Sequence, residues 1–153
     1  MSNQKLSVFC LVGLSATLSL AQEGQKPNLS GSWQLSVADS KVDVSKIATG
    51  TWLIEQDGPS IHILRVETLQ DSKESKREIR CTTDGKQCTE KGIKISFWYN
   101  GDALVELDVA GETTSEYSMS LAPGGKTLTV DVTHITPVGD KEKLVFDHAK
   151  SSG

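Results

Sequence analysis

The histidines and carboxylates of this sequence match no catalytic or metal-binding motif in their spacing. The three histidines are His62, His134 and His148, and none stands at a metal-ligand spacing from another histidine or a cysteine. Asp131 and His134 are three positions apart, so on a strand they would project to opposite faces of the sheet. No G-x-S-x-G motif and no phosphate-binding glycine loop occurs. The sequence therefore predicts a protein that is not an enzyme and that uses no metal and no cofactor.

Two cysteines, Cys81 and Cys88, flank a turn that contains Asp84-Gly85. Asp-Gly favours a tight turn, so we expect the two thiols to face each other on a hairpin. In an exported protein this arrangement predicts a disulfide. The six-residue spacer does not fit the two-residue spacing of redox motifs or of common zinc knuckles, and free thiols are the remaining alternative.

Residues 1–21 have the pattern of a secretory signal peptide. Lys5 precedes an apolar stretch over residues 6–20, and small residues occupy positions −3 and −1 of a cleavage site before Gln22. The alternative, a membrane anchor, requires roughly 20 apolar residues, and this stretch has about 15. We therefore expect a secreted or periplasmic protein with a single domain over residues 22–150 and no membrane span in the mature chain.

The charge of the chain limits its partners. The full sequence has a formal net charge of −4 at pH 7, and loss of the leader with its one cation makes the mature chain more acidic. An acidic surface is repelled by nucleic acids and by anionic membranes. We therefore expect a small hydrophobic or amphipathic molecule, or another protein, as partner, and no nucleic acid.

Apolar and polar residues alternate with period two over most of the mature chain, which is the pattern of half-buried strands. Strands are expected over residues 33–37, 51–56, 61–67, 78–89 (a hairpin), 93–99, 103–110, 116–121, 128–132 and 143–146. The charged run 71–78 is expected to be a solvated loop that leads into a strand. The sequence thus predicts an all-β antiparallel meander of about 8–10 strands. Closure into a barrel would remove exposed edges, and a two-sheet sandwich is the alternative.

One segment has helical signals. Ser40 has the character of an N-cap, and Val44, Ile47 and Ala48 would fall on one helical face. We expect one short helix near residues 41–48, although the β-branched valines there also suit a strand.

Gly31-Ser32-Trp33 stands at the start of the first expected strand. This motif resembles the G-x-W signature of the lipocalin and fatty-acid-binding (calycin) superfamily, although the T-D-Y turn of lipocalins is missing. The resemblance implies a barrel in which Gly31 permits a tight bend and Trp33 plugs one end. It also implies a cation from Lys141 or Lys143 stacked across the indole, and a lid formed by residues 40–48 over the open end.

Several polar residues fall in the middle of expected strands: Arg65, Glu67, Glu106, Asp108, Asp131 and His134. Facing inward, they would form a site for a polar head group, and facing outward they would make the barrel soluble. Alternation does not decide between these two arrangements, because both faces of the strands contain a mixture of residues.

The aromatic residues give further binding candidates. Trp98 alternates with Phe97 and Tyr99, so it faces the opposite side of the sheet, either lining the lumen or exposed as an anchor for a partner. Trp52 begins a strand near one rim of the barrel. The candidate ligand-binding residues are Trp52, Arg65, Trp98, Tyr117 and His134.

These observations favour an exported, non-enzymatic protein that binds a small apolar or amphipathic ligand inside a β-barrel. The alternative is a filled barrel that acts through its surface as an interaction module or inhibitor, with the cystine loop and Trp98 as contacts. A cavity inside the barrel would distinguish the first function from the second.

Overall fold

The computed structural model describes residues 26–42 and 46–149. The signal peptide predicted over residues 1–21 lies outside the described residues. Within the described part, the chain forms ten strands and no helix. The strands are β1 (Gly31–Leu35), β2 (Ile47–Asp57), β3 (Ser60–Leu69), β4 (Glu74–Thr82), β5 (Gln87–Glu90), β6 (Ile93–Asn100), β7 (Ala103–Ala110), β8 (Thr113–Leu121), β9 (Thr127–Thr136) and β10 (Glu142–His148).

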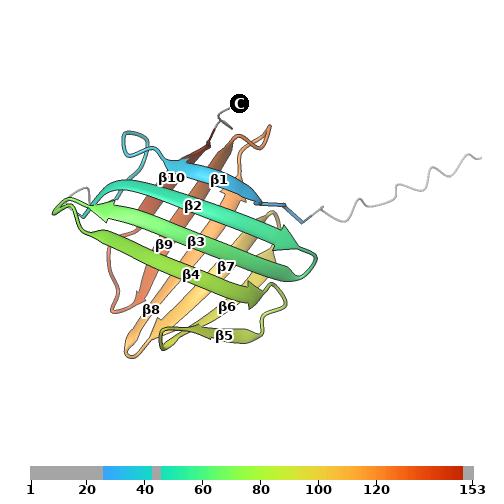
Figure 1. Ribbon diagram of the computed structural model, residues 1–153. Coiled ribbons are helices and arrows are strands. Elements are labelled where there is room, and N and C mark those ends of the chain that lie inside the picture. The colour runs from blue at the N-terminus through green and yellow to red at the C-terminus, as the bar shows by residue number, and fades with distance from the viewer. Residues whose placement is uncertain (1–25, 43–45, 150–153) are drawn as a thin grey trace, which may run out of the picture.

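The ten strands form one antiparallel sheet in the order β4-β3-β2-β1-β10-β9-β8-β7-β6-β5. Consecutive strands pair with each other except β4 and β5, and the pairing of β1 with β10 joins the first strand to the last. The sheet curls until its edge strands, β4 and β5, approach each other, and the layer of β2, β3 and β4 crosses steeply over the strands behind it (Figure 1). The predicted all-β meander is confirmed as a nearly closed barrel.

Tight turns explain the meander. Asp57 pairs with Ser60 across a two-residue loop, and Asn100 pairs with Ala103 in the same way. Gly101, inside the second loop, has a φ of 58°, which a side chain on Cβ would disfavour. Such short loops fix the register of each hairpin and thereby decide which side chains face the interior.

Trp33 closes one end of the barrel, which we call the closed end. Its side chain is buried, and its Nε1 donates a 2.9 Å hydrogen bond to the carbonyl oxygen of Leu29. His148 packs against the indole at right angles, with 4.9 Å between the ring centroids. A Cβ on Gly31 would lie 2.8 Å from Nε2 of His148, so the glycine of the motif provides room for this contact.

The cation expected across Trp33 is a wrong prediction. Lys141 lies at the opposite end of the barrel, where it lines a pocket at the mouth. Lys143 is joined through its backbone to Lys41, in the connection between β1 and β2. His148 takes the expected position because β10 runs antiparallel to β1 and brings its last residue opposite Trp33.

The short helix near residues 41–48 is also a wrong prediction for the residues that the structure describes. Lys41 forms an isolated antiparallel bridge with Lys143, and Ile47 and Ala48 begin β2. Residues 43–45 lie outside the described residues. Ile47 pairs with Leu69 of β3, so pairing with a neighbouring strand outweighs the local helix signal.

The predicted disulfide between Cys81 and Cys88 is present, with 5.7 Å between the two Cα atoms. The predicted hairpin is not, because Cys81 belongs to β4 and Cys88 to β5, the two edges of the sheet. The disulfide therefore crosses the seam between β4 and β5, where the hydrogen-bonded ladder of the barrel is interrupted. It replaces backbone pairing with a covalent link.

The interior is apolar toward the closed end. There, inward-facing side chains from most strands pack into one buried cluster, which we call the closed-end core. Its members are Leu29, Trp33, Ile54, Ile61, Ile63, Ile79, Ile95, Phe97, Leu104, Met119, Leu128, Val130 and Phe146.

Candidate functional site

A cavity of about 220 Å³ occupies the lumen on the other side of this core. It continues into a wider mouth pocket of about 820 Å³, because both are lined by Val42, Ile47, Glu67, His134 and Glu142. The remaining residues that line the inner cavity are Trp52, Arg65, Ser75, Arg77, Tyr117, Val132 and Leu144. The connection between β1 and β2 thus contributes Val42 at the mouth, where the family resemblance placed a lid.

Four of the five predicted ligand-binding residues line this cavity: Trp52, Arg65, Tyr117 and His134. Trp52 and Arg65 are cross-strand partners on β2 and β3, and Tyr117 opposes Val132 on β8 and β9. The period of two along each strand therefore turns all four to the same inner face.

Trp98, the fifth, does not line the cavity. Its neighbour Phe97 is fully buried in the closed-end core, so Trp98 projects from the outer face of β6. Its cross-strand partner Val105 is 3% exposed on that outer face. Trp98 is therefore placed beside Val105 on the outside of the barrel.

Arg65 is held from three directions. Its guanidinium lies 4.0 Å from the ring centroid of Trp52 and 5.1 Å from that of Tyr117. It also forms a hydrogen-bonded ion pair with the carboxylate of Glu106, whose side chain is fully buried. Stacking between aromatic faces and pairing with an acid are the contacts that a buried guanidinium requires.

Arg77 forms a second ion pair next to the first. Its Nη1 donates a 2.8 Å hydrogen bond to Oδ2 of Asp108, and its Nε lies 3.5 Å from Oε2 of Glu90. Since Arg77 belongs to β4 and Glu90 to β5, the second contact crosses the same seam as the disulfide. We call Arg65, Arg77, Glu90, Glu106 and Asp108 the lumen charge cluster.

The polar residues at mid-strand thus divide between the two faces. Arg65, Glu106 and Asp108 are buried inside the barrel, while Asp131 is exposed on the outside. Asp131 and His134 project to opposite faces, as their spacing predicts.

Arg77 and Glu90 were not among the predicted site residues. The charged run 71–78 was expected to be a solvated loop, but most of it belongs to β4, which begins at Glu74. Arg77 precedes the buried Ile79 by two positions, so it shares the inner face of that strand. This spacing was the signal in the sequence that could have identified it.

Burial changes the proton affinities of the cluster. The pKa of Glu106 is raised to about 7, mainly by burial and in addition by the neighbouring Asp108, against the opposing charge of Arg65. The pKa of Tyr117 is also raised, mainly by burial. For Arg77, burial alone lowers the pKa, but the charge and hydrogen bond of Asp108 outweigh it and the net shift is upward.

The cluster leaves several buried polar atoms without a hydrogen-bond partner in the described part of the chain. Three are donors, namely Nε1 of Trp52, Nε of Arg65 and Nη2 of Arg77. Two are acceptors, Oε1 of Glu106 and Oδ1 of Asp108. Because buried polar groups are nearly always paired in proteins, these unpaired atoms make the floor of the cavity the candidate for a polar binding surface.

A hydroxyl, an imidazole and a carboxylate form a chain at the mouth. Nδ1 of His134 lies 3.2 Å from Oγ of Ser115, and its Nε2 lies 2.9 Å from Oε2 of Glu142. A nucleophile would also need backbone donors for an oxyanion. Ser115 lies on β8, between β7 and β9, so the backbone N–H groups of β8 point along the sheet to those strands. The two contacts together orient the imidazole of His134 at the mouth.

No group of three or more histidine, cysteine or acidic side chains is arranged for a metal ion within residues 26–42 and 46–149. Over the same residues, no helix has the length and apolar character needed to cross a membrane.

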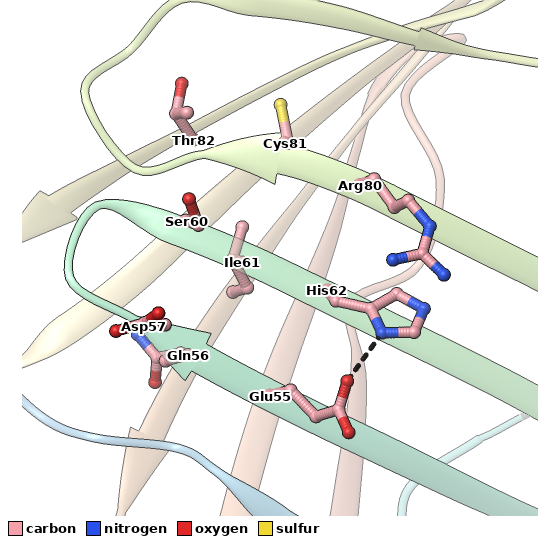
Figure 2. A pocket seen from close by; sticks show the side chains of 9 residues that line it. All are labelled: Glu55, Gln56, Asp57, Ser60, Ile61, His62, Arg80, Cys81 and Thr82. Atoms are coloured by element: carbon pink, nitrogen blue, oxygen red, sulfur yellow. Dashed lines mark hydrogen bonds and ion pairs between the residues drawn. The ribbon is translucent and has the colours of Figure 1, made fainter.

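A second hollow, of about 500 Å³, lies near the closed end on the outer side of β2, β3 and β4. Figure 2 shows Glu55, His62 and Arg80 along it, with His62 directed at Glu55. His62 contacts Glu55 at 2.8 Å and Glu78 at 3.0 Å, and Arg80 contacts Glu78 at 2.6 Å. His62 and Arg80 are thus already paired with neighbouring acids, and most of the charged side chains in this hollow are exposed, so we assign the binding site to the lumen.

Solved structures share this architecture. A fatty-acid-binding protein of Schistosoma mansoni in complex with arachidonic acid has a TM-score of 0.61 and 18% identity, covering 80% of this chain and 96% of its own. The fluorescent protein UnaG has a TM-score of 0.59 and 17% identity, with 78% and 96% covered. A secretory abundant heat soluble protein of Ramazzottius varieornatus has a TM-score of 0.59 and 11% identity, with 83% and 99% covered.

No protein-family model matches the sequence, and no curated protein matches it. The structural similarity, at these low identities, shows the fold. The chain has a calycin-like β-barrel with a cavity at one end. Its structural neighbours include two proteins named as fatty-acid-binding proteins, from Schistosoma mansoni and Manduca sexta.

Proposed function

We propose that this protein is an exported, non-enzymatic carrier that holds one small hydrophobic or amphipathic molecule in the open half of its barrel. The observation that carries the proposal is the lumen cavity, in which apolar walls surround a polar floor. Ligand sites in proteins typically combine an apolar lining with a few fixed polar groups.

Two further observations support the proposal. A structural neighbour is named as a fatty-acid-binding protein in complex with arachidonic acid, which is an amphipathic molecule. The pattern of residues 1–21 is that of a leader for export, so the proposed location is secreted or periplasmic. Detection of a mature chain that begins at Gln22 outside the cytoplasm would test the location.

The test of binding uses Nile red, an uncharged dye whose fluorescence increases in apolar surroundings. Val132→Trp places an indole in the cavity, because Val132 lines it from β9. Thr133→Trp is the matched control, because residue 133 faces the outside of the same strand. We expect Val132→Trp to weaken dye binding by about tenfold or more, or about 1.4 kcal/mol, and the control to leave it within about twofold.

Native purification followed by mass spectrometry gives an independent readout. A co-purifying small molecule that Val132→Trp loses and Thr133→Trp retains would agree with the proposal. Absence of dye binding and of any co-purifying molecule would contradict it and favour the barrel that acts through its surface.

A further inference from the structure

We propose that the ligand of this barrel carries an uncharged hydrogen-bond acceptor, such as an ester, ketone or amide carbonyl, at its buried end and not a carboxylate. This inference rests on the proposed function, because it names the class of molecule that the lumen would select.

The charges on the cavity floor are already matched by the protein itself. Arg65 is paired with Glu106, and Arg77 is paired with Asp108 and lies near Glu90. All three carboxylates are shielded from solvent, with side-chain exposures of 0%, 9% and 10% for Glu106, Asp108 and Glu90. The cluster thus holds three acids for two arginines. A ligand carboxylate would add a further negative charge to a desolvated site in which each guanidinium already has an acid partner.

The unpaired atoms favour an acceptor over a donor. The three unpaired donors belong to Trp52, Arg65 and Arg77, which line the cavity. The two unpaired acceptors belong to Glu106 and Asp108, which do not line it. The side chains that line the cavity therefore hold unpaired N–H groups directly beneath its surface, and a carbonyl oxygen is their uncharged complement.

The apolar walls fix the orientation of such a ligand. Val132 and Leu144 flank the inner cavity, and Val42 and Ile47 line both this cavity and the mouth. A carbonyl on the floor would let the hydrocarbon run past these side chains toward the mouth pocket. The Schistosoma mansoni neighbour, in contrast, is in complex with a carboxylic acid. The same fold would here select a different head group.

Competition against Nile red tests this inference with three amphiphiles of equal chain length: methyl decanoate, decanoate and decylammonium. At about pH 8, above the pKa of about 7 for Glu106, the carboxylate that pairs with Arg65 is ionised. We expect methyl decanoate to displace the dye at a concentration lower by about tenfold or more than either charged amphiphile.

Other outcomes separate the two proposals. Equal or tighter binding of decanoate, tightest binding of decylammonium, or bound dye that none of the three displaces would overturn the head-group inference and leave the carrier function standing. Failure of both the dye and all three amphiphiles to bind would overturn the carrier function, and the head-group inference with it.

A variant at Glu106 tests whether the pairing of Arg65 with this acid causes the preference for methyl decanoate over decanoate. Glu106→Gln releases Arg65 from its acid partner, so decanoate should gain about tenfold relative to methyl decanoate. Asp131→Asn makes the same change in net charge on the outer face, and it should leave the ratio unchanged. If Glu106→Gln does not fold, Asp108→Asn makes the equivalent change beside Arg77. An unchanged ratio in a folded variant would contradict the inference.

Discussion

The closed end and the open end of this barrel are built from the same strands but by opposite means. Along β3, the inward residues run from Ile61 and Ile63 at the closed end to Arg65 and Glu67 in the lumen. The alternation between faces never breaks, and only the polarity of the inward residues changes. The closed end is a packed apolar core, and the open end has a cavity above buried ion pairs.

This difference separates stability from binding within one sheet. Burial of apolar area stabilises the closed end, at roughly 25 cal/mol for each Å² removed from water. The ion pairs of the lumen contribute less, because the cost of desolvating their five charges offsets most of their attraction. We therefore expect substitutions at the closed end to affect stability, and equivalent substitutions in the lumen to affect ligand binding.

Replacing one tryptophan at each end tests this contrast most strongly. Trp33→Ala should lower the free energy of unfolding by about 5 kcal/mol, because it leaves a cavity in a packed core and removes the hydrogen bond to Leu29. Trp52→Ala should cost about 2–3 kcal/mol, because Trp52 already borders a cavity that water can enter.

Urea unfolding gives the two stabilities, and Nile red titration gives the two affinities. Trp98→Ala, on the outer face, is the control for loss of an indole outside both regions. A larger stability loss for Trp52→Ala than for Trp33→Ala would contradict the division between the two ends.

The ion pair between Arg65 and Glu106 can be replaced by apolar side chains that extend the core. Glu106→Leu alone should destabilise the protein by about 4 kcal/mol, because it leaves the buried guanidinium of Arg65 without its acid. The double variant Arg65→Met/Glu106→Leu should recover that loss or exceed the native stability by about 1 kcal/mol.

The same double variant should lose Nile red binding, because it removes the polar floor of the cavity. Thermal unfolding and dye titration measure both effects. Full dye affinity in a stable double variant would show that the charge cluster does not form the binding surface.

These contrasts also explain how far the sequence predicts the structure. Alternation placed Ile61, Ile63 and Arg65 on one face. Trp52 became a binding candidate as the start of a strand near one rim, which is wrong, because it lies in the middle of β2. On β7 the same alternation did not show which face of the strand points into the barrel. Val105 and Leu107 are apolar on one face, while Glu106 and Asp108 are acidic on the other. Composition alone favours the apolar face as the inner one.

The structure turns Glu106 and Asp108 inward because Arg65 and Arg77 face them across the lumen. Those contacts join strands that are more than 30 residues apart in the chain. The register that brings these arginines opposite these acids depends on the length of every intervening turn. Local sequence patterns therefore do not predict it. The helix expected near residues 41–48 failed for a similar reason, because pairing of Ile47 with Leu69 decided the local structure.

The pH dependence of stability should report on the open end alone. Burial raises the pKa of Glu106 from 4.5 to about 7, so the folded state binds this proton more tightly than the unfolded state. The native protein should therefore be more stable at about pH 5 than at pH 8, by at most about 3 kcal/mol, and lose this stability as the pH rises through 7.

Glu106→Gln should abolish this difference between pH 5 and pH 8, and Asp131→Asn should retain it. Urea unfolding of all three proteins at both pH values makes the measurement. An identical pH dependence in Glu106→Gln would assign the effect to other groups.

The seam between β4 and β5 is linked by the disulfide toward the closed end and by the contact of Arg77 with Glu90 toward the open end, so the two ends can also be compared within the seam. Removing the disulfide with the double variant Cys81→Ser/Cys88→Ser should cost about 2.5 kcal/mol, from the entropy of closing a loop of about eight residues. Glu90→Gln, which weakens the 3.5 Å contact with Arg77, should cost less than about 1 kcal/mol, because Asp108 still holds the guanidinium. If the dye affinity falls in Glu90→Gln while it is unchanged without the disulfide, the seam itself divides into a stabilising part and a binding part. Equal effects of the two changes on both quantities would mean that the seam acts as one unit.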